Sequence, residues 1–185
     1  MSKESDLVKT AYDLVQLLDK AAEDTLPEEI ADVVKLHAKL AVGSAWIPVP
    51  GADVAAGAAT MWTMYLRINS KIGMSFGENI LKTIASGVAT NLEGYAAALT
   101  VGGALKFIPV IGSVGGALVM SATLYALTLT SGYIYLKAIT AMLKSKRSGC
   151  NDEKLKQTVE SILRDDTNEI KNFMNAAKKS YKKES

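Results

Sequence analysis

The 185-residue sequence has only one cysteine and one histidine, which limits the chemistry it can carry. A single thiol, Cys150, can form neither an intramolecular disulfide nor a cysteine-based zinc site. The histidine, His37, lies on an amphipathic segment between two lysines, and no serine or cysteine nucleophile is identifiable as its partner. The sequence also lacks a GxxxxGK[ST] phosphate-binding loop. We therefore expect no catalytic residues, no metal and no cofactor.

Two further features are scarce: strand-like alternation and net charge. No segment alternates apolar and polar residues between turn residues, so the chain is predicted to be all-α. The formal net charge is only +2, which gives little support for nucleic-acid binding. The N-terminus has no apolar run of the signal-peptide kind, so secretion is not expected.

Hydrophobic residues, by contrast, make up 49% of the chain, and the charges are unevenly placed. Residues 1–39 are net negative, whereas residues 106–147 hold five basic residues and no acidic one. The thirty residues from Phe107 to Leu136 carry no charge at all. A spanning helix needs about twenty apolar residues, so this segment is long enough to cross a bilayer.

Two proline- and glycine-containing motifs interrupt the apolar segments, and they lie about sixty residues apart. Proline fixes its own φ angle, disfavours helix at the preceding residue and donates no backbone hydrogen bond, while glycine permits a sharp reversal. Each motif is therefore predicted to be the tip of an apolar helical hairpin, and the two hairpins read as a pseudo-repeat. The predicted tip residues are Pro48, Pro50, Gly51 and Asp53 in the first copy and Pro109, Gly112 and Gly116 in the second.

Apolar spacing and capping residues predict six helices, in a helical bundle built around the two hairpins and flanked by amphipathic N- and C-terminal helices. Asn151 is expected to cap the last helix, and Gly73 to close the third. The organisation predicted is an amphipathic helix in 1–26, a double-hairpin domain in 27–147, and an amphipathic helix with a basic tail in 148–185. The expected helices span about 6–23, 27–46, 53–71, 79–106, 113–142 and 152–180.

Residues from about Ala38 to Met142 resemble the bacterial domain of unknown function 697, a helical domain often associated with GTPases. The residues that carry the resemblance are Ile47 to Asp53, Met64, Gly73, Ile108 to Gly112, Tyr125 and Tyr133. The sequence departs from the family pattern at Met61, Ile72 and Thr128. The resemblance implies a helical, frequently membrane-associated domain with a GTPase partner and no established activity.

Membrane association is the leading hypothesis from the sequence, with both termini on the cytoplasmic side. Aromatic residues near hairpin ends and basic residues after an apolar helix are typical of membrane interfaces. A soluble packed core accounts for the same residues, since short apolar runs are also typical of buried helices. The candidate interface residues are Trp46, Trp62, Tyr65, Lys144, Lys146 and Arg147.

The sequence therefore favours a non-enzymatic module whose apolar hairpins insert into or dock on membrane lipid while the outer helices engage a partner, such as a GTPase. One alternative is a soluble helical bundle that forms homo-oligomers or holds a lipid-like ligand. A third is a pore-forming or toxin-related protein that opens its hairpins on contact with lipid.

Overall fold

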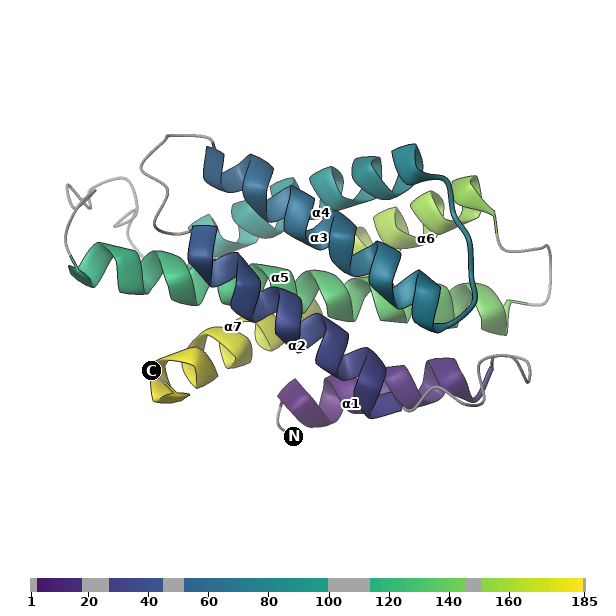
Figure 1. Cartoon of the computed structure of the whole chain (residues 1–185), viewed down its shortest axis with the longest axis horizontal. Helices are drawn as coiled ribbons and strands as arrows, with labels where there is room; N and C mark the ends of the chain where they lie inside the picture. The colour runs from purple at the N-terminus through teal and green to yellow at the C-terminus, as the bar shows by residue number, and fades with distance from the viewer. Residues whose placement is uncertain (1–2, 18–26, 45–51, 100–113, 146–150, 185) are drawn as a thin grey trace.

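The computed structural model describes residues 3–17, 27–44, 52–99, 114–145 and 151–184, which form seven helices and no strand (Figure 1). The all-α prediction is therefore confirmed. The helices are α1 (Lys3–Val15), α2 (Pro27–Ser44), α3 (Ala52–Lys71), α4 (Glu78–Leu99), α5 (Val114–Lys144), α6 (Asp152–Asp165) and α7 (Thr167–Glu184).

Helix α5 is the centre of the bundle and packs against each of the other six helices. It is apolar around its whole circumference, and a helix of that kind is stable in water only when it is buried. Every residue from Leu124 to Leu136 is buried. The long uncharged segment of the sequence is thus the core helix of the fold.

The amphipathic helices α1, α6 and α7 cover one side of α5. Each turns one apolar stripe inward and its charged residues outward, as helical spacing requires. The segments predicted as separate N- and C-terminal flanks therefore share one hydrophobic core with the hairpins. The inward residues are Leu7, Ala11 and Leu14 on α1, Leu155, Val159, Ile162 and Leu163 on α6, and Ile170, Phe173, Met174 and Ala177 on α7.

The C-terminus of α3 is closed by a glycine, as predicted. Gly73 has a φ of +66°, a left-handed conformation that favours glycine. The Met74 N–H donates to the Asn69 carbonyl at 3.0 Å, which satisfies one of the open carbonyls of the last turn. The predicted cap at the start of α6 is also present, because the Asn151 side chain accepts from the Lys154 N–H at 2.9 Å.

The prediction of one continuous helix over 152–180 is wrong, because the chain bends at Asp166 between α6 and α7. Asp166 has φ −102° and ψ 23°, outside the helical well, although its N–H still donates to the Ile162 carbonyl. Its carboxylate lies 2.9 Å from Lys137 Nζ on α5. No glycine or proline marks the bend, so no local pattern predicts it. Helix α7 also continues to Glu184, beyond the predicted end.

The first helix is shorter than predicted. It ends at Val15, and the chain then turns, with the Leu17 N–H donating to the Leu14 carbonyl at 3.0 Å. The predicted helical stretches 18–23, 45–46, 100–106 and 113 fall outside the described residues.

Candidate functional site

The two hairpins point in the same direction along the bundle. In Figure 1 the C-terminal ends of α2 and α4 and the N-terminal ends of α3 and α5 all lie toward the left end of the long axis. We call this the hairpin end of the molecule, formed by the described residues 40–44, 52–66, 94–99 and 114–136. The helix ends that flank residues 45–51 and 100–113 thus lie at one end of the bundle.

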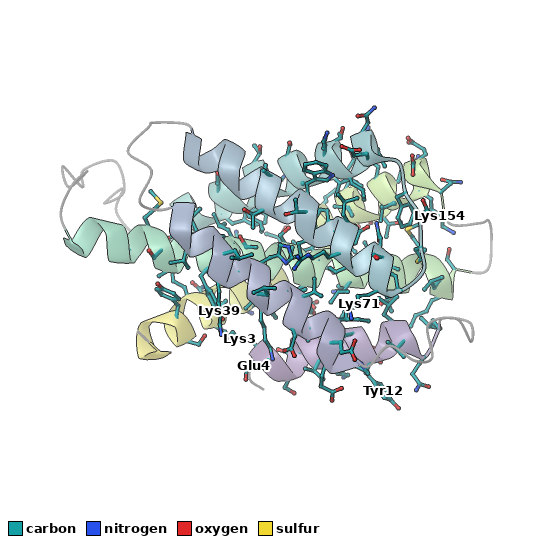
Figure 2. The ribbon with its side chains drawn as sticks, viewed as in Figure 1. Lys3, Glu4, Tyr12, Lys39, Lys71 and Lys154 are labelled. Carbon is teal, nitrogen blue, oxygen red and sulfur yellow. The ribbon has the colours of Figure 1, made fainter. Side chains whose placement is uncertain are left out.

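Within the described ranges of the hairpin end, Asp53 is the only charged residue, and each range ends at the first charge beyond it on its helix, namely Lys39, Arg67, Glu93 and Lys137. The exposed positions there are occupied by apolar or small uncharged residues, including Leu40, with 59% of its surface exposed, and Met120, with 37%. The opposite half carries ion pairs between helices, such as Lys71 Nζ to Glu29 Oε2 at 2.9 Å. Figure 2 shows the labelled Lys154 toward that opposite end, Lys71 nearer the middle, and Lys39 and Lys3 in the half nearer the hairpins. Along α2, α3, α4 and α5, the charged residues are therefore concentrated away from the hairpin end.

Most of the predicted tip residues lie outside the part of the chain that the structure describes. Pro48, Pro50, Gly51, Pro109 and Gly112 lie outside the described residues, as do Trp46, Lys146 and Arg147. Asp53 is the second residue of α3, and Gly116 is the third residue of α5.

Tyr65 was a candidate for the membrane interface, which requires a surface position, but it lies in the core. It is 0% exposed, and its ring stacks on Tyr135 of α5 with centroids 4.0 Å apart. The Tyr65 hydroxyl bonds to Ser131 Oγ at 2.6 Å, and the Tyr135 hydroxyl donates to Asn69 Oδ1 at 2.8 Å. Burial raises the pKa of both tyrosines, so both hydroxyls stay protonated. This residue pins α3 to α5 within the core.

Trp62 and Lys144 occupy different environments. Trp62 is half-buried against the core, and the Lys82 ammonium of α4 lies 4.3 Å from its ring centroid, within range of a cation–π contact. Lys144 is exposed and is the last residue of α5, at the end opposite the hairpin end.

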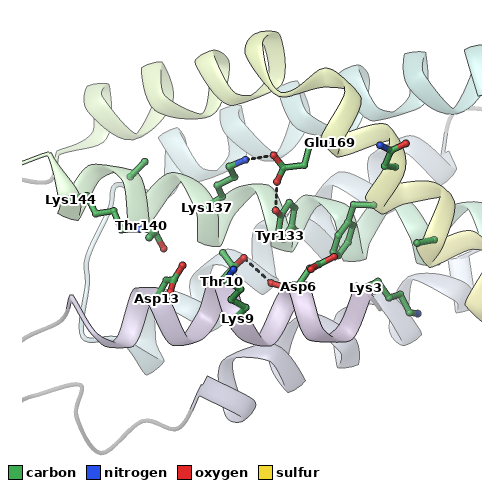
Figure 3. A pocket seen from close by; sticks show the side chains of 14 residues that line it. Lys3, Asp6, Lys9, Thr10, Asp13, Tyr133, Lys137, Thr140, Lys144 and Glu169 are labelled. Atoms are coloured by element: carbon green, nitrogen blue, oxygen red, sulfur yellow. Dashed lines mark hydrogen bonds and ion pairs between the residues drawn. The ribbon is translucent and has the colours of Figure 1, made fainter. Parts of the chain in front are cut away.

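A groove of about 790 Å³ lies between α1, α5 and α7 (Figure 3). Its centre is a polar network: Lys137 Nζ lies 2.8 Å from Glu169 Oε2 and 2.9 Å from Asp166 Oδ2, and the Tyr133 hydroxyl donates to Glu169. The Tyr133 ring also stacks on Phe173 of α7 with centroids 4.4 Å apart. These groups satisfy one another, so they act as a lock between α5 and the α6–α7 bend.

The electrostatics of the lock follow from its burial and its pairing. Burial raises the pKa of the Glu169 carboxyl, but the hydrogen bonds from Lys137 and Tyr133 outweigh that effect and leave the pKa lowered. Burial likewise lowers the pKa of Lys137, but the two carboxylates outweigh it and leave the pKa raised. Burial, reinforced by Glu169, raises the pKa of Tyr133. Sequence reasoning missed this network, although the α5 spacing 133, 137, 140 and 144 places those four side chains along one face.

His37 is buried in the packed interior, with 3% of its surface exposed. Its Nδ1 lies 2.7 Å from the Val33 carbonyl, so Nδ1 carries the proton and donates. Burial lowers its pKa, which keeps the ring neutral. Within the described ranges, no group of three His, Cys, Asp or Glu side chains is placed to hold a metal ion.

One helix of the described structure, Val119–Lys144 within α5, is long and apolar enough to cross a membrane. However, 83% of its most apolar 18-residue window is buried inside the bundle. A core helix of a soluble protein has the same length and composition, so this feature alone does not distinguish the two.

Comparison with known proteins adds one distant similarity. No family model and no solved structure matches the chain. Over 120 residues, 64% of its length, the chain is 27% identical to magnetosome membrane protein 22 of Magnetospirillum gryphiswaldense. The matched region spans 60% of the length of that relative.

Proposed function

We propose that the protein is a non-enzymatic helical module that docks on a membrane surface through the hairpin end while its bundle stays folded. The observation that carries the proposal is the charge distribution: Asp53 is the only charge among the described residues of that end. Burying a charged side chain in the bilayer costs about 2.5–3.5 kcal/mol on insertion scales. Of the two ends of the hairpin helices, the one with a single charge therefore has the lower free-energy cost of contact with lipid.

Docking fits the packing of α5 better than spanning does. To span the membrane, α5 would have to separate from α1, α6 and α7, or these helices would have to enter the hydrocarbon core with it. Their outer faces are charged, and each charge in the hydrocarbon core is costly. The inward faces of these helices would also lose the apolar contacts that hold them in the bundle. We therefore infer that the hairpin end reaches the interface and that the middle of α5 stays covered by protein.

The distant relative supports the membrane part of this proposal, because its name describes a membrane protein. The cytoplasmic face is the proposed location. The polar outer faces of α1, α6 and α7 remain in water in this arrangement and are the proposed partner surface. A GTPase is the partner that the resemblance to the domain of unknown function 697 implies.

Flotation of the full chain on liposomes tests the proposal, with exposed apolar residues as matched probes. Leu40→Glu and Met120→Glu place a charge at the hairpin end. Tyr12→Glu on α1 and Leu17→Glu in the turn after α1 place one elsewhere, and both of these residues are also exposed. None of the four side chains is in the core, so the fold should survive. We expect the first pair to reduce lipid-bound protein by about 10-fold or more and the second pair to leave it unchanged. Wild-type protein that stays at the bottom of the gradient with its helicity intact would contradict the proposal.

The burial of α5 favours a second candidate, a soluble bundle that forms homo-oligomers or holds a lipid-like ligand. This candidate predicts a discrete, detergent-free species in light scattering that does not float with lipid. It also predicts that Leu40→Glu changes the oligomeric state if the exposed apolar residues of α2 form the contact.

A further inference from the structure

The second half of α7 is strongly basic. It carries Lys178, Lys179, Lys182 and Lys183, and no acidic residue lies between Glu169 and Glu184. Most basic runs of this kind are simply solvated helix ends. A binding role for this one therefore has to be argued from its position in the fold.

The fold brings this basic end back to the uncharged half of α5. The ring of Tyr181 on α7 packs against that of Tyr125 on α5, with centroids 5.2 Å apart. Lys3 of α1 reaches the same tyrosine, with its Nζ 3.1 Å from the Tyr125 hydroxyl and 4.6 Å from its ring centroid. Three helices therefore fix the end of α7 at Tyr125.

The position of Tyr125 places the lysines close to the hairpin end. At a rise of 1.5 Å per residue, Tyr125 lies about 16 Å along the axis from the first residue of α5. In Figure 1 the C-terminus of the chain lies toward the same end of the long axis as the start of α5 and the ends of the hairpins. Lys144, at the other end of α5, is about 45 Å from that start.

We propose that the C-terminal end of α7 is an electrostatic site for anionic lipid headgroups, beside the apolar surface that docks. The inference rests on the proposed function and names its lipid class. The basic end of α7 is held at Tyr125, about 16 Å along the axis from the start of α5. Because an interfacial segment enters the headgroup region by about 5–10 Å and surface potentials act over a Debye length of about 8 Å, this helix end comes within range of the headgroup layer when the hairpin end docks. An apolar end gives contact with any bilayer, and an adjacent basic helix end adds selectivity for a negatively charged one.

The site differs from the basic cluster that the sequence alone singles out. Lys144, Lys146 and Arg147 follow the apolar helix in the sequence, but α5 carries Lys144 to the end away from the hairpins. The α7 lysines are remote from the hairpins in sequence and lie near them in the fold. The two clusters therefore make opposite predictions for lipid binding.

Flotation of the full chain with two kinds of vesicle tests the site. One kind is pure phosphatidylcholine, and the other contains about 30% phosphatidylglycerol, at low and at physiological salt. The test variant neutralises Lys178, Lys179, Lys182 and Lys183 to Gln, a residue with similar helix propensity. The control variant removes the same number of charges elsewhere in the chain, as Lys144→Gln at the last residue of α5, Lys146→Gln and Arg147→Gln shortly after it in the sequence, and Lys156→Gln on α6. Circular dichroism checks that both variants remain folded.

We expect wild-type protein to bind the anionic vesicles at least about 10-fold more tightly than the neutral ones, with the difference reduced by salt. The α7 variant should lose that difference and keep its binding to neutral vesicles, whereas the control variant should behave as wild type. Equal binding of wild type to both vesicles, or an equal loss in both variants, would overturn the site while leaving docking itself intact. Absence of binding to either vesicle would overturn the proposed function and the site together.

Discussion

At the scale of single residues, α2 and α5 approach each other closely at Gly132. Gly132 of α5 lies against Val34 of α2. A Cβ added at Gly132 would overlap Val34 Cγ1 and would lie 2.8 Å from Cγ2 and 3.1 Å from Cβ of the same valine. Contacts this short do not occur between real side chains, so the absence of a side chain at Gly132 sets the spacing of the two helices.

We predict that Gly132→Ala destabilises the protein by about 1–2 kcal/mol, because overpacking outweighs the gain in helix propensity. The matched control is Gly87→Ala on the exposed face of α4, where an added Cβ meets nothing within 4 Å. This substitution should raise the free energy of unfolding by about 0.5–1 kcal/mol. Chemical denaturation measures both.

The overlap also predicts a coupling between the two positions. Val34→Ala should destabilise alone, yet the double variant with Gly132→Ala should be more stable than the sum of the single changes by about 1 kcal/mol. Strict additivity would show that the helices move apart at no cost, against the packing described here.

At the scale of helices, the lock between α5 and the α6–α7 bend makes stability depend on pH. The pKa of Glu169 is lowered in the fold, so its contribution is present above the ordinary carboxyl range and is lost as the pH falls through the folded value. The pKa of Lys137 is raised, so its contribution is present below the ordinary lysine value and is lost as the pH rises through the folded value.

We therefore predict that Glu169→Gln lowers the free energy of unfolding at pH 7 by no more than about 1 kcal/mol, because half-exposed pairs are screened by solvent. Once the pH has fallen below the lowered folded pKa of Glu169, the wild type and the variant should be equally stable, since the wild-type carboxylate is then protonated. The exposed Glu78, which pairs with Lys82 at 2.8 Å on one helix, is the control, and Glu78→Gln should change little at either pH. A difference for Glu169→Gln that persists at low pH would assign its effect to packing.

The existence and type of the helices followed from local patterns, because apolar spacing, the Asn151 cap and Gly73 act within a few residues. The bend at Asp166 did not, since it is accompanied by an ion pair to Lys137 on a helix almost thirty residues earlier. Tyr65 was assigned to an interface from its position near a hairpin, whereas its stacking on Tyr135 depends on how α3 packs against α5. The α1–α5–α7 groove joins the two ends of the chain, and no local signal predicts it.

At the scale of the whole molecule, the hairpin ends of α2 to α5 carry few charges, and the basic end of α7 lies beside them. The sequence showed where the charges are scarce, and the structure shows that four helices bring those segments to one end. It also shows that the apolar α5, read from sequence as a spanning candidate, is enclosed by amphipathic helices. Under the proposed function, this fold therefore meets a membrane surface through its sparsely charged end rather than through a spanning helix.

The most direct test of docking through the hairpin end is a fluorescence measurement of depth. Cys150 is the only cysteine, so Cys150→Ser gives a background for single labels that respond to solvent polarity. Labels at Leu40→Cys and Met120→Cys report on the hairpin end, and labels at Tyr12→Cys and Leu17→Cys report on α1 and the turn that follows it; all four native side chains are exposed. On adding anionic vesicles, we predict that emission shifts to the blue at the first two sites and stays unchanged at the other two. A uniform shift at all four sites, or a shift at the α1 sites alone, would contradict docking through the hairpin end.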